Sequence, residues 1–285
     1  MDRTTLTIEE KVRDFLREDL GYGDITSEAL IDEGQMAKAS LYFREEGIVA
    51  GLDEAATVFS LLGCKVKILK EEGTNASAGE ALMEVEGSAK ALLAGERTAL
   101  NIVGRMAGIA TTVENLSSKV AGVNPGATVA ATRKTAPGLR DMDKQAVDLG
   151  GGDTHRFRLD DCVLIKDNHL SLLPSITEAV RRARSRVSFT KKIEVEVGTL
   201  EEAEEAARAG ADIIMFDNMP PLEIERCLSV LGEKGLREGR IFEASGNITP
   251  ENVEEYAEAG VDIISMGCLT HSVRSLNVKL EIEML

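Results

Sequence analysis

Hydrophobic positions after Val123-Asn124-Pro125-Gly126 fall into short apolar runs separated by amphipathic segments of helical length. The runs cover residues 128–132, 162–165, 193–197, 213–216, 241–244 and 263–266. Runs of this length, bounded by glycine and polar residues, are typical of buried strands, so the pattern predicts a parallel sheet of βα units with right-handed crossovers. The segments 210–214 and 260–264 resemble each other, as expected of successive units of an α/β barrel. No Gly-x-Gly-x-x-Gly follows the first run, which argues against a dinucleotide-binding fold.

The first third of the chain has a different pattern, which predicts a small α+β unit. Apolar residues at helical spacing predict a helix around residues 8–16, and a long helical pattern extends from 88 to about 119. Gly104 and Gly108 within the long pattern predict close packing. Short apolar runs predict strands of an open sheet at 39–43, 65–69 and 81–85.

These patterns predict two domains. We place an N-terminal α+β domain in residues 1–115 and the α/β barrel in residues 116–269, with a C-terminal helix over about 270–285 that packs back on the first domain. Within the barrel, Thr199 predicts the start of one helix, and Thr249 followed by Pro250 predicts the start of another.

Composition excludes several classes of function. The chain has 285 residues, a formal net charge of -16 and a pI near 4.8, so general binding to nucleic acid or to an anionic membrane is not expected. The four cysteines are far apart and form no C-x-x-C pair, which argues against a disulfide framework or a zinc site. The N-terminus lacks the features of a signal peptide, and no apolar stretch is long enough to span a bilayer. We therefore expect a cytoplasmic, reduced protein.

Cations gather locally in spite of this acidic balance. Arg133 and Lys134 follow the apolar run at 128–132, and His155-Arg156 and Lys166 occur in two later short segments. If these segments converge, they form a binding site for a small anion. Taken alone, Lys166 could equally pair with Asp167 at the surface, and a single histidine is more often an ordinary, partly buried side chain.

Polar residues also follow the other predicted strands, whose carboxyl ends meet at the mouth of a barrel, where ligands bind. Glu194 and Glu196 share one face of a strand, so at least one is expected to meet a cation or a ligand. Asp217 could contact a ligand or cap the next helix.

Two loops have the small residues that a phosphate site needs. Ser245-Gly246-Asn247 precedes a predicted helix N-terminus, and Gly267 follows the last strand. Tight turns that require glycine are the alternative explanation. The three glycines at 150–152 predict a loop that closes over a ligand.

Several motifs in order resemble the quinolinate phosphoribosyltransferase family over nearly the whole chain. In the second part they are Thr132-Arg133-Lys134-Thr135, Gly150-Gly151-Gly152 with His155-Arg156, Leu164-Ile165-Lys166-Asp167-Asn168-His169, Glu194-Val195-Glu196-Val197 and Ala244-Ser245-Gly246. In the first part they are Gly21-Tyr22-Gly23-Asp24-Ile25-Thr26 and Glu96-Arg97-Thr98-Ala99-Leu100-Asn101. The resemblance implies an incomplete α/β barrel of six to seven parallel strands, an N-terminal α+β open sandwich domain, and a homodimer or higher even oligomer whose active sites are shared between subunits.

The resemblance also implies the reaction and its substrates. Members of the family join quinolinate to phosphoribosyl pyrophosphate (PRPP) with release of pyrophosphate and carbon dioxide, giving nicotinate mononucleotide for NAD biosynthesis. Both substrates are polyanions, which explains a cationic cluster in an acidic protein. Magnesium is the implied cofactor, held by Glu196 and Asp217 largely through PRPP and water.

Roles for individual residues follow from the resemblance. The quinolinate carboxylates are expected to meet Arg133, His155 and Arg156, with Arg97 from a neighbouring subunit. Lys134 and Lys166 are expected between the two substrates, while Glu196 and Asp217 hold the ribose hydroxyls; these four are the expected catalytic residues. The 5′-phosphate is expected to meet Ser245, Gly246, Asn247 and Gly267.

The chain departs from the family pattern at Thr154, Arg158 and Asn247, and three other functions remain possible. A paralogue linked to molybdenum transport shares the fold. A Schiff-base aldolase would use Lys166 as its nucleophile, with an amine activated by neighbouring cations. A non-catalytic binding protein is the third.

Overall fold

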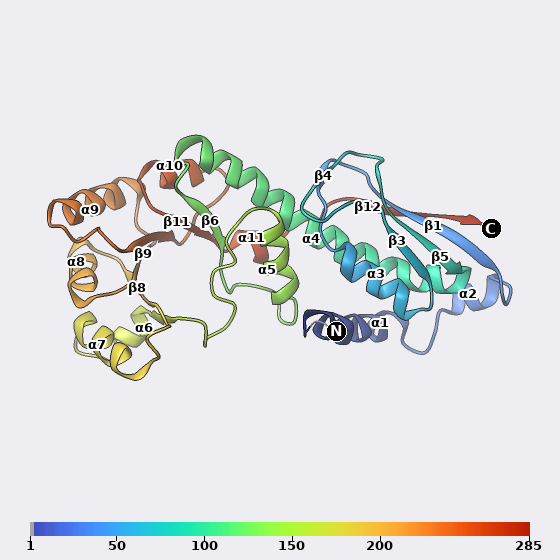
Figure 1. Ribbon diagram of the computed structural model, residues 1–285, viewed down its shortest axis with the longest axis horizontal. Helices are drawn as coiled ribbons and strands as arrows, with labels where there is room; N and C mark the ends of the chain where they lie inside the picture. Colours follow the sequence, from blue (N-terminus) through green and yellow to red (C-terminus); the bar gives the residue numbers. More distant parts are fainter. Residues whose placement is uncertain (1–2) are drawn as a thin grey trace. The chain divides into compact units, whose positions relative to one another are not determined.

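The protein, a computed structural model in which residues 3–285 are described, divides into two compact units (Figure 1). One contains the chain up to Thr112 together with Val273–Leu285, and the other is Val113–Ser272. The long helix α4 (Ala89–Val123) begins in the first unit and ends in the second. No helix in the described part of the chain has the length and apolar character needed to cross a membrane.

The second unit contains six parallel strands in the order β6-β11-β10-β9-β8-β7. Their bounds are β6 (Thr128–Ala131), β7 (Val163–Ile165), β8 (Ile193–Val197), β9 (Ile213–Asp217), β10 (Ile241–Ser245) and β11 (Ile263–Met266). All six predicted strands are therefore confirmed. The sheet ends at β6 and β7, which do not pair with each other, so the barrel is incomplete.

Helices connect these strands and cover their outer side (Figure 1). They are α5 (Arg140–Leu149), α6 (Asp167–Leu170), α7 (Ile176–Arg186), α8 (Leu200–Ala209), α9 (Pro221–Glu233), α10 (Val253–Glu258) and α11 (Cys268–His271). The Thr199 side chain caps α8 by accepting a hydrogen bond from the backbone of Glu202, as predicted. The predicted helix start at Pro250 is wrong: α10 begins only at Val253, because the Thr249 side chain closes a local turn onto Glu251 instead.

The first unit is built on an antiparallel sheet in the order β12-β1-β5-β3. The strands are β1 (Met36–Phe43), β3 (Lys65–Ile68), β5 (Ala81–Ser88) and β12 (Val278–Met284), with a separate pair β2 (Gly47–Ile48) and β4 (Asn75–Ala76). The helices are α1 (Arg3–Leu20), α2 (Ile25–Leu30), α3 (Leu52–Leu61) and the first part of α4. Gly108 packs closely, as predicted: a Cβ there would lie 2.2 Å from the Arg274 carbonyl oxygen.

The predicted helix over about 270–285 is wrong. After the short α11, the chain forms β12, which pairs antiparallel with β1 from Ala37↔Met284 to Phe43↔Val278. The reason lies in the sequence itself: Val278, Leu280, Ile282 and Met284 alternate with polar residues, and this period of two suits a strand.

Candidate active site

A cavity of about 570 Å³ lies at the carboxyl ends of the parallel strands. Most of the residues predicted for the site line it: Arg133, Lys134, His155, Arg156, Lys166, Glu196, Asp217, Ser245, Gly246 and Asn247. These residues lie in the ends of the strands or in the segments beside them, so parallel packing of the strands brings together side chains that are up to 114 residues apart in the chain (Arg133 to Asn247).

Two of the residues that the sequence predicts for the site do not line the cavity. Gly267 is outside the lining set, although it packs against a residue in it, since a Cβ there would lie 3.1 Å from Lys134 Cδ. Arg97 is exposed on α4 within the first unit. Its expected contact with the substrate of a second subunit therefore stays a prediction.

The cations near β6 have no carboxylate partner among the described residues. Neither Arg133 nor Arg156 makes a side-chain ion pair there, and the buried Arg133 Nε has no hydrogen-bond partner. Burial lowers the pKa of Arg133, and the nearby charges of Arg156 and Arg140 lower it further. Glu194 is near enough to interact with the charge of Arg156 but makes no direct ion pair with it, so both guanidinium groups keep hydrogen-bond donors for an anion.

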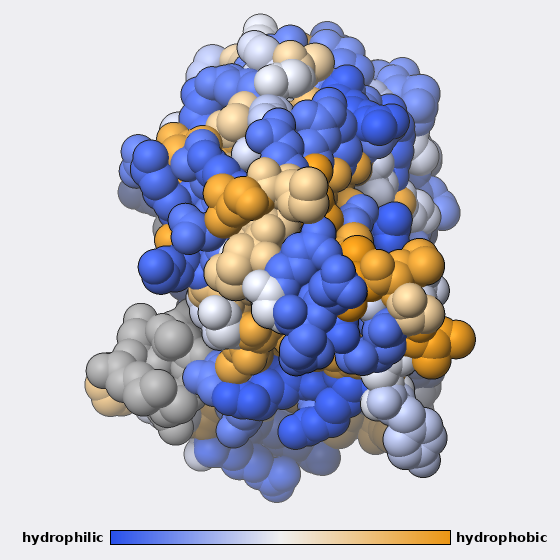
Figure 2. All heavy atoms as spheres, turned by 90° about the vertical axis from the view of Figure 1, so that its right-hand side faces the viewer, coloured by the Kyte–Doolittle hydropathy of each residue, from blue (hydrophilic) through white to orange (hydrophobic). Residues whose placement is uncertain are grey.

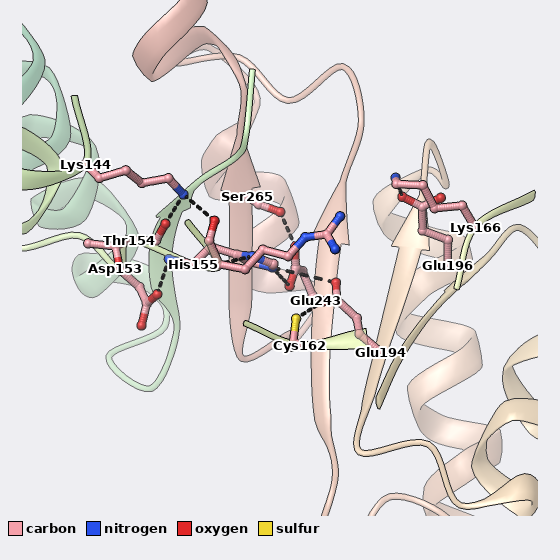
Figure 3. Close-up of polar contacts among 11 residues, drawn as sticks. Lys144, Asp153, Thr154, His155, Cys162, Lys166, Glu194, Glu196, Glu243 and Ser265 are labelled. Atoms are coloured by element: carbon pink, nitrogen blue, oxygen red, sulfur yellow. Dashed lines mark hydrogen bonds and ion pairs between the residues drawn. The ribbon is translucent and has the colours of Figure 1, made fainter. Parts of the chain in front are cut away.

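Lys166 pairs with a carboxylate inside the cavity. Its Nζ donates a hydrogen bond to Glu196 Oε1, not to Asp167, so the expected alternative of a surface pair with Asp167 is not what the structure contains (Figure 3). The Schiff-base hypothesis required an amine surrounded by cations, and a direct carboxylate contact does not provide that environment.

Glu196 and Asp217 form the acidic side of the cavity. Burial raises the pKa of Glu196; the hydrogen bond from Lys166 opposes this, and the charge of Asp217 adds to it. Asp217 does not cap the following helix, since α9 has Pro220 at its N-cap and no side-chain cap. Both carboxylates line the cavity, and carboxylate oxygens are ligands that magnesium prefers, so this pair could hold the metal; the magnesium role stays a prediction.

The Ser245-Gly246-Asn247 turn is tightly packed. Gly246 has φ +93°, and a Cβ there would lie 2.4 Å from Asn218 Oδ1, so only glycine fits. Asn247 also has a left-handed backbone, with φ +52°, and its Nδ2 donates to Asn218 Oδ1 at 2.8 Å. Asparagine tolerates this conformation better than most residues, which accounts for its occurrence at this position.

His155 is held by two buried glutamates (Figure 3). Its Nε2 lies 3.1 Å from Glu243 Oε2 and 3.7 Å from Glu194 Oε1, and Ser265 Oγ donates to the other oxygen of Glu243. The sequence predicts that at least one of Glu194 and Glu196 meets a cation or ligand, and Glu196 does so at Lys166, whereas it gives no such prediction for Glu243. The signal was available, because Glu243 is also a carboxylate within a buried apolar strand.

Both ring nitrogens of His155 already have partners. The backbone N–H of Arg156 donates to Nδ1 at 2.7 Å, which places the ring hydrogen on Nε2, facing Glu243. Burial opposes protonation of His155, but the nearby Glu194 carboxylate and the hydrogen bond with Glu243 outweigh it and raise the pKa to about 10. A second proton would have to enter at Nδ1 and would displace the N–H donor of Arg156, so the backbone of this segment favours the neutral ring and works against the protonation that the two carboxylates favour.

The same geometry argues against a metal ion at this cluster. Ligand atoms of His155, Glu194 and Glu243 lie within 4.8 Å of one another, as a metal site requires. However, a hydrogen on Nε2 leaves that nitrogen without a lone pair for a metal. We therefore assign the cluster to internal hydrogen bonding.

The three glycines follow α5 and lead toward the sheet, and their closure over a ligand stays a prediction. Gly150 ends α5, Gly151 has φ +80°, and a Cβ on Gly152 would lie 2.7 Å from Val113 Cγ1. The next residue, Asp153, bridges to Ala130 beside β6. Close packing therefore explains Gly152, and the left-handed backbone explains Gly151.

The departures at Thr154 and Arg158 have simple explanations. The Thr154 carbonyl oxygen, which any residue could supply, accepts a hydrogen bond from Lys144 (Figure 3). The Arg158 side chain is exposed, and its Nη2 lies 3.7 Å from Asp141 Oδ1. Lys144 itself was missed, because nothing in the helical pattern of α5 distinguishes it from a surface lysine.

Comparison with known proteins agrees with this arrangement. The family model described as quinolinate phosphoribosyl transferase, N-terminal domain, matches residues 24–107, and the C-terminal domain model matches 109–281. A Methanothermobacter thermautotrophicus protein named probable nicotinate-nucleotide pyrophosphorylase (carboxylating) is 48% identical over 272 residues, covering 95% of this chain and 98% of that protein. The human protein named nicotinate-nucleotide pyrophosphorylase (carboxylating) is 36% identical, and the match covers 97% of this chain and 92% of that protein.

A solved structure shares both units. The crystal structure of NadC from Streptococcus pyogenes has a TM-score of 0.92 at 35% identity and covers 100% of this chain and 99% of that one. Together with the domain matches, this similarity shows that the chain belongs to the quinolinate phosphoribosyltransferase family.

Proposed function

We propose that this protein transfers the phosphoribosyl group of PRPP to quinolinate with decarboxylation, giving nicotinate mononucleotide, pyrophosphate and carbon dioxide in NAD biosynthesis. The observation that carries the proposal is the pair of unpartnered guanidinium groups, Arg133 and Arg156, at one side of a cavity whose other side contains Glu196 and Asp217. A dianionic aromatic acid suits the first side, and a magnesium-bound sugar pyrophosphate suits the second.

Quinolinate is proposed to lie against Arg133 and Arg156, because a guanidinium can give a carboxylate two parallel hydrogen bonds. Lys134 follows β6, Lys166 follows β7, and both line the cavity, so they are proposed to contact the pyrophosphate and a carboxylate. We assign His155 a weaker role than the family resemblance suggests, since both its nitrogens are already bonded.

PRPP is proposed to place its 5′-phosphate at the turn of Ser245, Gly246 and Asn247, where the close-packed glycine lets the backbone approach the ligand. Glu196 and Asp217 would bind the ribose hydroxyls and hold magnesium, largely through PRPP and water. Bound magnesium would offset the negative charge of the departing pyrophosphate.

The chemistry needs positioning more than covalent help from the protein. The pyridine nitrogen forms a bond to the anomeric carbon as the bond to pyrophosphate breaks, and Glu196 and Asp217 stabilise the positive charge on the ribose. The carbon–carbon bond to the adjacent carboxylate then breaks to release carbon dioxide, and its electron pair stays on the ring carbon, where the positive charge of the pyridinium nitrogen stabilises it. The resulting carbanion takes up one proton.

We further propose that the protein is a homodimer or higher even oligomer, in which Arg97 reaches the active site of a second subunit. Exposed apolar side chains on the first unit support self-association, notably Ile25 and Leu30 on α2, which are 84% and 75% exposed. Figure 2 shows hydrophobic groups between hydrophilic ones on the face that carries α2 and the C-terminus. The four cysteines are free thiols, which suits a reducing compartment such as the cytoplasm.

The decisive experiment incubates the pure protein with quinolinate, PRPP and magnesium, and follows carbon dioxide and mononucleotide. Product formation that depends on all three, and that falls at least about tenfold in Asp217→Asn, supports the proposal. Binding of both substrates without product would contradict it and favour the molybdenum-linked paralogue or a binding protein. Borohydride trapping of a substrate on Lys166 would instead support the aldolase.

A further inference from the structure

Lys144 is a fully buried lysine that the proposed reaction does not use. It lies in the middle of α5, has no exposed surface and does not line the cavity. Its burial lowers the pKa to about 8. The charges of Arg140, Arg133 and Arg156 lower it as well, and Asp153 opposes them. A lysine in such surroundings costs stability, so its contacts need an explanation.

Those contacts are all with the segment that carries Arg156. Lys144 Nζ donates to the carbonyl oxygens of Thr154 and Arg156, the latter at 3.1 Å, and thereby spans His155 (Figure 3). It also lies 5.7 Å from the centre of the Phe157 ring. Two carbonyl groups that face the interior are satisfied by one ammonium group.

Further hydrogen bonds fix the same segment. The backbone N–H of His155 donates to Asp153 Oδ1 at 2.5 Å, while the His155 ring contacts Glu243 and accepts from the backbone of Arg156. His155 has φ +50°, a conformation that a residue with a side chain keeps only when its surroundings impose it. Lys144 provides two of the bonds that impose it.

We propose that Lys144 is a positioning residue that holds residues 154–156 so that Arg156 meets the quinolinate carboxylate, and that its ammonium charge makes quinolinate binding pH-dependent. This inference rests on the proposed function. Lys144 does not touch the substrate; it acts through the backbone of the segment and through its charge beneath the anion site.

The direction of the pH effect follows from linkage. Without quinolinate, burial first and the surrounding cations second favour the neutral amine above about pH 8. A bound dianion favours the ammonium, so binding above this pH takes up a proton and weakens as pH rises. Besides the arginines, Asp153, the Phe157 ring and the titratable His155, which lies between the two carbonyl groups that Lys144 contacts, are near Lys144; the arginines keep their charge throughout this range.

The test compares Lys144→Met, Lys144→Arg and, as matched control, the exposed Lys192→Met in steady-state kinetics from pH 7 to 9.5. For the wild type, we expect the KM for quinolinate to rise several-fold between pH 7.5 and 9. Lys144→Met should raise this KM at least about tenfold at pH 7 and change that for PRPP less than about threefold. Lys144→Arg keeps the charge and two donors, so it should stay closer to wild type and lose the pH dependence, and the control should behave as wild type.

A second measurement covers the case in which a variant does not fold. Calorimetric titration of wild-type protein with quinolinate at pH 8.5, in two buffers of different ionisation enthalpy, should show uptake of up to about three-quarters of a proton per site. No uptake by an active wild-type enzyme, or equal KM changes for both substrates in a folded Lys144→Met, would overturn the inference. Absence of product from the wild type would instead sink the proposed function, so the two failures are distinct.

Discussion

His155 and Arg156 are adjacent in the chain, yet their side chains differ in whether they have partners within the protein. The His155 ring has partners on both nitrogens, two of them being buried glutamates, whereas the Arg156 guanidinium has no carboxylate partner among the described residues. A polar group that is satisfied within the protein contributes to the fold, and a charge left without a partner in a cavity is available to a ligand. Changes to the Glu243–His155 group should therefore alter stability, and changes to the Arg133–Arg156 group should alter binding.

The largest expected effect is on binding. Arg156→Ala should raise the KM for quinolinate at least about 100-fold, because it removes a two-bond contact with a carboxylate in a partly desolvated site, worth about 3 kcal/mol. The KM for PRPP should change little, and thermal stability should stay the same or rise, since a repelling charge is gone. Arg158→Ala, an exposed change in the same loop, is the control. Equal increases in KM for quinolinate and PRPP would contradict the proposed contact between Arg156 and quinolinate.

Next in size is a loss of stability. Glu243→Ala leaves the His155 Nε2–H and the Ser265 hydroxyl without their acceptor, at a cost of about 2–3 kcal/mol in the free energy of unfolding. Urea denaturation measures this. Glu243→Gln retains an acceptor for His155 and should lose less than half as much. If Glu243→Ala were as stable as wild type, the internal role of this cluster would be wrong.

A smaller effect depends on pH. Burial and the nearby charge of Glu243 raise the pKa of Glu194, so the folded state holds a proton that the unfolded state releases above about pH 4.5. The stability that this bound proton contributes is lost as the pH rises through the pKa that Glu194 has in the folded protein. Relative to wild type, Glu194→Gln should therefore gain about 1 kcal/mol between pH 5 and pH 8 in urea denaturation. A gain at low pH instead would mean that Glu194 is charged in the fold.

The smallest effect is expected at Asn247. Glycine adopts its left-handed backbone without strain, and only the hydrogen bond with Asn218 is lost, so Asn247→Gly should change stability by less than about 1 kcal/mol. The KM for PRPP should stay within about threefold of wild type. A tenfold increase would show that the Asn247 side chain itself, and not only the turn, contacts the phosphate.

Much of the barrel and its site could be predicted because the relevant signals are local. Each of the six strands is a short apolar run, and parallel strands in a barrel bring their carboxyl ends to one mouth, so residues such as Lys166 and Asp217 could be assigned to one site. The helix starts were less certain. Thr199 caps α8 as expected, while the similar Thr249 closes a turn instead, since one side chain can satisfy either arrangement.

By itself, the sequence determined the strand pattern, the family, and the cations and carboxylates at the cavity, because periodicity and motif spacing are properties of neighbouring residues. Which charged side chains are paired depends on contacts between residues that are distant in the chain. Glu243 meets His155 across 88 residues, and Lys144 reaches two carbonyl oxygens that any sequence could supply. Likewise, β12 becomes a strand by pairing with β1 at the opposite end of the chain. Such contacts depend on strand register and on the length of the side chains. In the sequence, His155 and Arg156 are therefore equal candidates for an anion site, and only the structure shows that His155 has partners within the protein.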